Sequence, residues 1–167
     1  MDDYTPNGSD RPWQSFKDTI KNVVINNGVT TIGYSAFRNC KNLSIVTIPA
    51  SVTEIDVPYV FVGCESLTSI SVDEYNQYYS SDEYGVLFNK DKTTLIQYPI
   101  GNTRTSYIIP DSVTSIGDRA FSGCWSLESV TIPDSVTSIG EGAFYNCTSL
   151  TSVTIPDSVT AIGNYAF

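Results

Sequence analysis

The sequence predicts a repeat solenoid, with short parallel β-strands on one face and turns with short 3-10 or helical segments on the other. The first observation is the octapeptide PDSVTSIG at residues 110–117 and 133–140, which recurs as PDSVTAIG at 156–163, so that the copies begin 23 residues apart. The second is that the apolar residues keep the same places in each copy. A lone coil of this length buries too little to be stable, so the coils must stack.

The same frame, less regular, extends upstream of these copies. Coils are expected at 23–46, 46–69, 107–129 and 130–152, with a truncated last repeat at 153–167. The segment 70–106 interrupts them. We therefore divide the chain into an N-terminal segment with a helical cap (1–22) and a single solenoid (23–167).

Each element of a coil has a local signal. Residues 130–132 (Val-Thr-Ile) alternate inward and outward as a short strand does. Pro133 ends strand pairing because it has no N–H to donate, and residues 134–135 (Asp-Ser) are typical of a turn. Gly140 allows a tight bend, and residues 141–144 are long enough for about one helical turn.

The N-terminal segment carries three apolar residues with helical spacing. Trp13, Phe16 and Ile20 lie on one face of a predicted short helix, and Pro12 suits its first turn. We interpret this helix as a cap over the first coil, since an uncovered end would expose core residues. The alternative is a surface helix that binds a partner through its aromatic residues.

The interruption at 70–106 keeps the stack continuous by other means. Residues 70–72 continue the strand ladder, and a loop rich in Ser, Asp and Tyr follows. Residues 85–99 predict a β-hairpin with a polar turn at 90–92. Its second strand, at 94–98, would form one irregular rung before the ladder resumes at 107–109.

Composition excludes several classes of protein. The net charge is −9 with a pI near 4.2, and such a surface repels nucleic acid and anionic membranes. No apolar run is long enough to insert into a membrane, and the acidic, polar first ten residues do not form a signal peptide. Because the last coil ends part-way, at Phe167, we expect a piece of a longer protein whose signal and anchor lie elsewhere.

No set of residues predicts catalysis, a cofactor or a metal site. The chain has no His, which removes the usual Ser-His-Asp and Cys-His nucleophile systems, and it has no phosphate-binding glycine motif. The four cysteines share one repeat position and are interpreted as buried small apolar residues, with a disulfide between neighbours (Cys40–Cys64 or Cys124–Cys147) as the alternative. The aspartates of the turns, Asp111, Asp134 and Asp157, are interpreted as turn caps, with a Ca²⁺ ladder as the alternative.

The repeat pattern L-x-x-V-x-I-P-x-x-V-x-x-I-G-x-x-A-F-x-x-C resembles the BspA-like leucine-rich repeats of bacterial cell-surface proteins. Leu127, Val130 and Ile132 match the strand of leucine-rich repeats, and Cys147 matches the region of their Asn/Cys position. The resemblance covers about 23–167. It implies a right-handed solenoid, a location outside the cell or on the surface of a bacterium, and adhesion to host or matrix proteins as a frequent role. No functional residue set comes with it.

Two surfaces are candidate binding sites for an unidentified host or matrix protein or glycan. One is the loop of tyrosines in the interruption, and the other is the row of outward-facing hydroxyls on the strands. The candidate residues are Tyr75, Tyr78, Tyr79, Tyr84, Ser71, Thr131 and Thr154. Tyrosine suits recognition because it offers apolar area and a hydroxyl at low entropic cost, although the same residues also suit packing of the insert.

The sequence leaves three functions to compare. The first is a non-catalytic binding module, the second is a structural spacer that projects another domain, and the third, an enzyme, is disfavoured by the missing chemistry. We also expect the C-terminal edge, with Val153 and Ile155, to be open, so that a homodimer through this edge is a further expectation.

Overall fold

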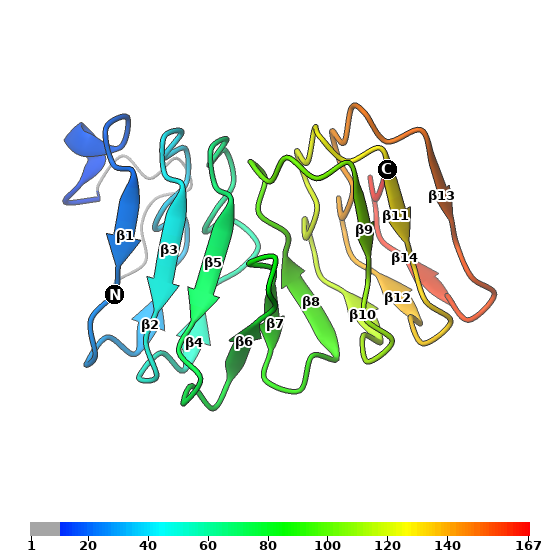
Figure 1. The fold of residues 1–167 in the computed structure, drawn as a ribbon, viewed down its shortest axis with the longest axis horizontal. Coiled ribbons are helices and arrows are strands. Elements are labelled where there is room, and N and C mark those ends of the chain that lie inside the picture. Colours follow the sequence, from blue (N-terminus) through cyan, green and yellow to red (C-terminus); the bar gives the residue numbers. More distant parts are fainter. Residues whose placement is uncertain (1–10) are drawn as a thin grey trace.

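The structure is a computed structural model that describes residues 11–167. It is a β-solenoid in which the coils lie side by side along the long axis (Figure 1). The first strand of a coil, called here its first rung, belongs to one of two parallel ladders, β1-β3-β5 and β9-β11-β13. Their strands are β1 Asn22–Val24, β3 Ile45–Ile48, β5 Ser69–Val72, β9 Ser106–Ile108, β11 Ser129–Thr131 and β13 Ser152–Thr154.

Equivalent residues of successive coils stand directly opposite one another in these ladders. Val46 pairs with Val23 and with Ile70, and Val130 pairs with Tyr107 and with Val153. The register therefore follows the sequence repeat, and the apolar side chain at the centre of each strand points into the core. The outward position predicted for Thr131 is confirmed.

A second set of strands runs through the coils at the position of Ser138–Ile139, and of these only the strand at 94–97 was predicted from the sequence. These strands are β2 Thr31–Ile32, β4 Glu54–Ile55, β8 Thr94–Gln97, β10 Ser115–Ile116, β12 Ser138–Ile139 and β14 Ala161–Ile162. They pair in parallel as β2-β4 and as β8-β10-β12-β14. Two-residue strands leave no room for a detectable alternation, which is why they were missed.

The expected helical turn at residues 141–144 is wrong. Among the described residues the only helical element is the 3-10 helix η1 Gln14–Phe16, and residues 141–146 form turns. The reason is that backbone N–H groups at this repeat position donate to the following coil. The N–H of Phe144 donates to the carbonyl of Ala166 at 2.6 Å, and the equivalent N–H of Phe121 donates to the carbonyl of Ala143 at 2.7 Å. These N–H groups are therefore not available for a helix.

Stacked rings run through the core beside these turns. Phe121 lies 4.8 Å from Phe144 with nearly parallel rings, and Tyr98 of the insert stacks on Phe121 at 5.2 Å. All four cysteines are free, with Cys40, Cys64 and Cys124 buried and Cys147 half-buried. Burial raises the pKa of Cys147 to about 11, so its thiol is protonated at neutral pH. The prediction of buried, unpaired cysteines is thus confirmed for three positions and partly for the fourth.

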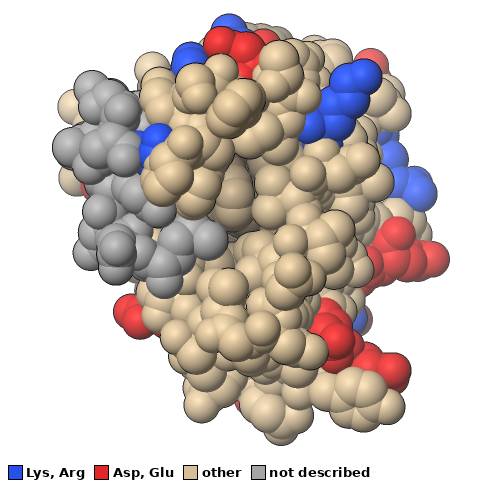
Figure 2. Space-filling view, turned by 90° about the vertical axis from the view of Figure 1, so that its left-hand side faces the viewer, with Lys and Arg blue, Asp and Glu red and all other residues tan. Residues whose placement is uncertain are grey.

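The N-terminal segment covers the first coil. Trp13 stacks on Phe37 at 5.9 Å, and Ile20 packs against the same core. The expected inward position of Phe16 is wrong, because its ring is 61% exposed. Since η1 ends after one turn, it does not hold three residues on one face. Figure 2 shows this end of the molecule, where uncharged side chains cover most of the surface and charged ones lie towards the rim.

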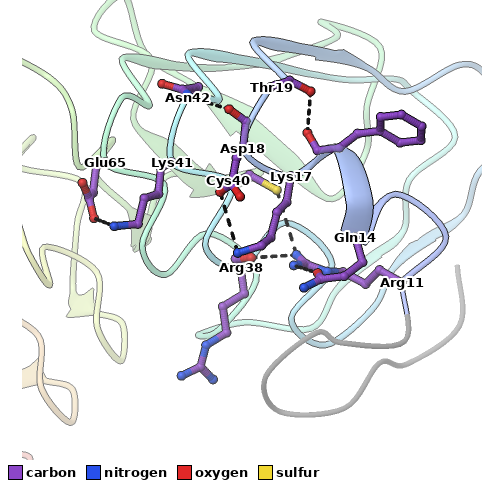
Figure 3. Close-up of polar contacts among 11 residues, drawn as sticks. Arg11, Gln14, Lys17, Asp18, Thr19, Arg38, Cys40, Lys41, Asn42 and Glu65 are labelled. Atoms are coloured by element: carbon purple, nitrogen blue, oxygen red, sulfur yellow. Dashed lines mark hydrogen bonds and ion pairs between the residues drawn. The ribbon is translucent and has the colours of Figure 1, made fainter.

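Arg11 completes this cap from a buried position (Figure 3). Its Nη1 donates to the carbonyls of Ser35, Ala36 and Arg38 at 3.2, 3.1 and 2.7 Å. Its Nη2 donates to Gln14 Oε1 at 2.7 Å. The segment therefore supplies hydrogen-bond donors as well as apolar cover, which the sequence pattern did not indicate.

The insert forms the predicted β-hairpin and one further strand. β7 Leu87–Asn89 pairs antiparallel with β8, and β6 Tyr79–Ser81 pairs antiparallel with β7. β8 also pairs in parallel with β10, so it is a rung of the second set of strands. Between β5 and β9 the loop at 82–86 lies in place of a first rung, and its Gly85 carbonyl accepts the Ile70 N–H at 3.0 Å. The prediction of a strand at 94–98 is confirmed, but its expected place as a rung of the main ladder is wrong, because it pairs with β10 and not with β9.

Candidate binding surfaces

The strand face carries the predicted hydroxyls. Ser71, Thr131 and Thr154 are all exposed. Thr131 pairs with Thr154 and, on its other side, with Ile108, which is 74% exposed. Ser71 belongs to the other ladder, across the insert (Figure 1). The face therefore brings Thr131 and Thr154 together and leaves Ser71 in a separate row.

The four candidate tyrosines divide into two pairs. Tyr75 and Tyr78 are 71% and 52% exposed. Tyr79 is half-buried, and its hydroxyl oxygen accepts the N–H of Ile55 at 2.9 Å. Tyr84 is also half-buried and lies beyond β6, at the opposite end of that strand from Tyr78. Only Tyr75 and Tyr78 present most of their rings to a partner.

Arg104 extends the surface around Tyr84. Its guanidinium lies 4.0 Å from the centre of the Tyr84 ring, and Tyr84 meets Tyr107 edge to face at 6.1 Å. Arg104 itself is exposed. Sequence reasoning missed this residue, because nothing local to 102–105 indicates a partner about 20 residues away. Tyr84 and Arg104 together form a cation–π pair where the first-rung ladder is interrupted.

Asn76 holds the loop of Tyr75 and Tyr78 in place. Its side chain is fully buried, and its Nδ2 donates to the carbonyls of Pro49 and Val52, both at 2.9 Å. Its Oδ1 accepts the N–H groups of Tyr78 and Tyr79, both at 2.8 Å. One amide thus makes four hydrogen bonds, two to the coil at 46–69 and two within the loop, so the exposed tyrosines stand on a fixed backbone.

Asp82 has a structural role in the neighbouring loop. Its Oδ1 accepts the N–H groups of Tyr84 and Val86 at 2.9 Å, and its Oδ2 accepts the hydroxyl of Tyr107 at 2.8 Å. Burial, together with this carboxylate, raises the pKa of Tyr107 far above its usual range. The hydrogen bonds of the Asp82 carboxylate therefore hold the loop at 82–86 in its conformation.

The turn side of the solenoid contains a groove that sequence reasoning missed. It has a volume of about 380 Å³ and lies between the coil at 46–69 and the coils at 107–129 and 130–152, over the end of the insert. Exposed aromatic residues, Trp125 and Tyr145, contribute to its lining together with Gln97, Arg119 and Glu65. Trp125 and Tyr145 occupy variable positions beside the shared cysteine, which is the one signal in the sequence that could have indicated them.

The other sequence alternatives find no geometric support among residues 11–167. No group of three or more His, Cys, Asp or Glu side chains there is arranged to hold a metal ion. Asp111, Asp134 and Asp157 lie exposed at their turns. No helix in that range has both the length and the apolar character to cross a bilayer.

The expected open edge at the C-terminal coil is present. Ile155 is 38% exposed and Val153 is half-buried, and with Phe167 they line a shallow hollow of about 310 Å³. The homodimer through this edge stays a prediction.

These features match one family of repeat proteins. The family model described as "BspA type Leucine rich repeat region" matches residues 13–104 and 98–167, with six copies. The chain belongs to the BspA-type leucine-rich repeat family. No curated protein matches it.

Solved structures of other leucine-rich repeat proteins have the same fold. A leucine-rich repeat protein from Eubacterium ventriosum is 28% identical over 98% of this chain, with a TM-score of 0.66. A leucine-rich cell surface protein from Faecalibacterium prausnitzii is 27% identical over 92%, with a TM-score of 0.65. The pneumococcal vaccine antigen PcpA, at 22% identity over 86% and a TM-score of 0.72, supports the fold alone.

This BspA-type chain spans only part of each of these neighbours. It covers 61% of the Eubacterium ventriosum protein, 52% of the Faecalibacterium prausnitzii protein and 47% of PcpA.

Proposed function

We propose that this BspA-type leucine-rich repeat chain is a non-catalytic binding module that works on the surface of a bacterium or outside the cell. It recognises a host or matrix protein or a glycan. The location is supported by the family and by the name of the Faecalibacterium prausnitzii neighbour, a cell surface protein. The non-catalytic role is supported by the lack of His in the chain.

The observation that carries the binding role is the pair of exposed tyrosines, Tyr75 and Tyr78, on a loop fixed by buried Asn76. A tyrosine ring has few rotatable bonds, and a fixed backbone loses little entropy when a partner binds. More than half of each side chain is exposed and free to contact a partner. Both features favour a macromolecular partner for this loop, with a protein as the favoured class.

The second candidate, a structural spacer, is favoured by the other two tyrosines. Tyr79 accepts a backbone hydrogen bond, and Tyr84 packs against Tyr107 and Arg104. Both therefore serve the fold. A spacer needs a continuous stack and no exposed anchor residues, so the behaviour of Tyr75 and Tyr78 separates the two functions.

The test is a binding screen of the purified chain against extracellular-matrix proteins and immobilised glycans. We expect at least one specific partner, with affinity reduced about tenfold or more in Tyr75→Ala/Tyr78→Ala, as for an aromatic hot spot. The control is Tyr165→Ala, whose side chain is 77% exposed elsewhere on the molecule. Equal binding by the double variant would show that the loop is not the site, and a screen without any partner would favour the spacer.

A further inference from the structure

The groove on the turn side lies where a regular hydrogen bond between coils is missing. In other coils the N–H just before the repeat cysteine donates to the following coil, from Asn39 to the Val62 carbonyl and from Gly123 to the Tyr145 carbonyl, both at 2.8 Å. Gly63 occupies the same place and has a similar φ, 75° against 60° for Asn39 and 77° for Gly123. Its N–H therefore points towards the next coil, which here is the insert.

The insert does not meet this donor. Among the described residues nothing accepts the Gly63 N–H, and nothing donates to the carbonyl of Ser122, which is the counterpart of the Val62 and Tyr145 carbonyls. The insert turns inward instead, and the Gly101 N–H donates to the Leu67 carbonyl at 2.8 Å. A Cβ on Gly101 would come within 2.5 Å of the Ser66 backbone, so only glycine allows the two backbone segments to approach this closely. An unpaired donor and an unpaired acceptor are thus left in the lining of the groove.

At the first coil, backbone hydrogen bonds to a neighbouring coil are also missing, but side chains replace them. There the carbonyls of Ala36 and Arg38 have no preceding coil, and Arg11 and Trp13 donate to them instead. The groove has no such substitute among residues 11–167. Since backbone groups with no protein partner require water or a ligand, this break is open to an incoming molecule that both donates and accepts.

A third polar group in the groove comes from Gln97, whose side chain is only 4% exposed. Its Nε2 donates to the carbonyls of Tyr98 and Ala120 at 2.8 and 3.3 Å, which fixes the orientation of the amide. No hydrogen bond from residues 11–167 reaches its Oε1. Gln97 lines the groove, so this oxygen is a second acceptor held in a fixed position.

Aromatic side chains and balanced charges complete the lining. Trp125 and Tyr145 are 48% and 51% exposed. Glu65 and Arg119 contribute one negative and one positive charge. Glu65 pairs with Lys41 at 3.1 Å, a contact shown in Figure 3, and the Arg119 guanidinium lies 5.2 Å from the centre of the Tyr59 ring. The lining is therefore close to neutral, with aromatic rings beside uncharged polar groups.

We propose that this groove is a second binding site, separate from the strand face and the tyrosine loop, and that it takes a neutral oligosaccharide. Each sugar hydroxyl both donates and accepts, which suits the Gly63 N–H and the Ser122 and Gln97 oxygens. The apolar C–H faces of a sugar ring suit the Trp125 and Tyr145 rings. A volume of about 380 Å³ lies within the range of small-ligand clefts. A peptide strand fits less well, because it binds through a run of alternating groups along one edge.

The test uses defined sugars with the whole chain. Maltotriose, cellotriose and tri-N-acetylchitotriose are the neutral probes, and sialyllactose is the anionic counterpart. We expect at least one neutral trisaccharide to bind at a 1:1 ratio by calorimetry, with a dissociation constant below about 1 mM. It should also shift the indole N–H resonance of Trp125 and leave that of Trp13 in place. If no neutral probe binds, or if sialyllactose binds best, the proposal is overturned.

Variants locate the binding. Trp125→Ala and Tyr145→Ala should each weaken it about tenfold or more. Tyr145 is half-exposed, so Tyr145→Ala keeps the test valid if the tryptophan variant does not fold. The Tyr75→Ala/Tyr78→Ala variant should bind the trisaccharide like the wild type, which separates this site from the tyrosine loop. Unchanged binding by both groove variants places the sugar elsewhere and overturns the assignment.

Discussion

Arg11 Nη1 donates a 2.7 Å hydrogen bond to the carbonyl oxygen of Arg38. In the next coil the equivalent carbonyl, that of Val62, accepts the backbone N–H of Asn39 at 2.8 Å. One guanidinium thus takes the place of the backbone donors of a preceding coil. A planar group with several fixed N–H donors suits this task better than an ammonium.

The first prediction concerns this cap. Arg11→Met should lower the free energy of unfolding by about 3 kcal/mol, since buried carbonyls lose a charged donor. Urea unfolding followed by circular dichroism measures the change. Lys21→Ala, at an exposed position of the same segment, should stay within about 0.5 kcal/mol. Equal urea midpoints for Arg11→Met and the wild type would show that Arg11 does not stabilise the cap.

The second prediction concerns Asn76. Asn76→Ala should cost about 2–4 kcal/mol, because it leaves two backbone carbonyls and two N–H groups without their partner. Hydrogen exchange should speed up across residues 73–90 more than in the coils. Gln77→Ala is the matched control, since that amide is exposed. If exchange rises equally throughout the chain, Asn76 is not a local anchor of the insert.

The third prediction concerns alkaline pH. Burial raises the pKa values of Tyr98 and Tyr107 above the value of about 10 in the unfolded chain, and it raises the pKa of Cys147 to about 11. For a group raised in the folded state, the full stability is present below the unfolded pKa and is lost as pH rises above it. Each buried tyrosine should therefore reduce the unfolding free energy above pH 10, by up to about 1.4 kcal/mol per pH unit.

Urea titrations between pH 7 and pH 11.5 measure this loss. Cys147 should begin to contribute near pH 9, since a free thiol titrates there, and its share should end near pH 11. Tyr107→Phe should be less stable at pH 7, because Asp82 loses the hydroxyl that donates to it, and should show a shallower decline above pH 10. The same decline in both proteins would mean that Tyr107 does not contribute.

The fourth prediction concerns the thiols. In the unfolded, unreduced protein all four cysteines should react with a thiol reagent, because none is in a disulfide. In the folded protein at pH 7 Cys147 should react first, since it alone is half-buried, and burial raises the pKa of Cys64 and Cys124 further. Cys147→Ser should remove the fastest phase. A count below four in the unfolded chain would restore the disulfide alternative.

Much of the coil could be predicted from the residues alone. The strand expected at 130–132 forms one residue earlier, at Ser129–Thr131. It, its outward Thr131 and the buried cysteines follow from the repeat, because equivalent residues of stacked coils meet equivalent neighbours. The two-residue strand at Ser138–Ile139 could not, since it consists only of hydrogen bonds to the adjacent coils. The helical turn was wrong for the same reason, as the donors at Phe121 and Phe144 serve the next coil.

The candidate sites show more clearly what could not be predicted from the sequence. The sequence by itself predicted that any binding specificity lies where the repeat fails, and it placed Tyr75 and Tyr78 among the candidate residues. Only the tertiary structure decided that Tyr79 and Tyr84 serve packing, that Arg11 ends the first coil, and that a groove opens beside Trp125. Each of these depends on contacts between residues some 20 or more positions apart. A repeat encodes such contacts only where it is intact.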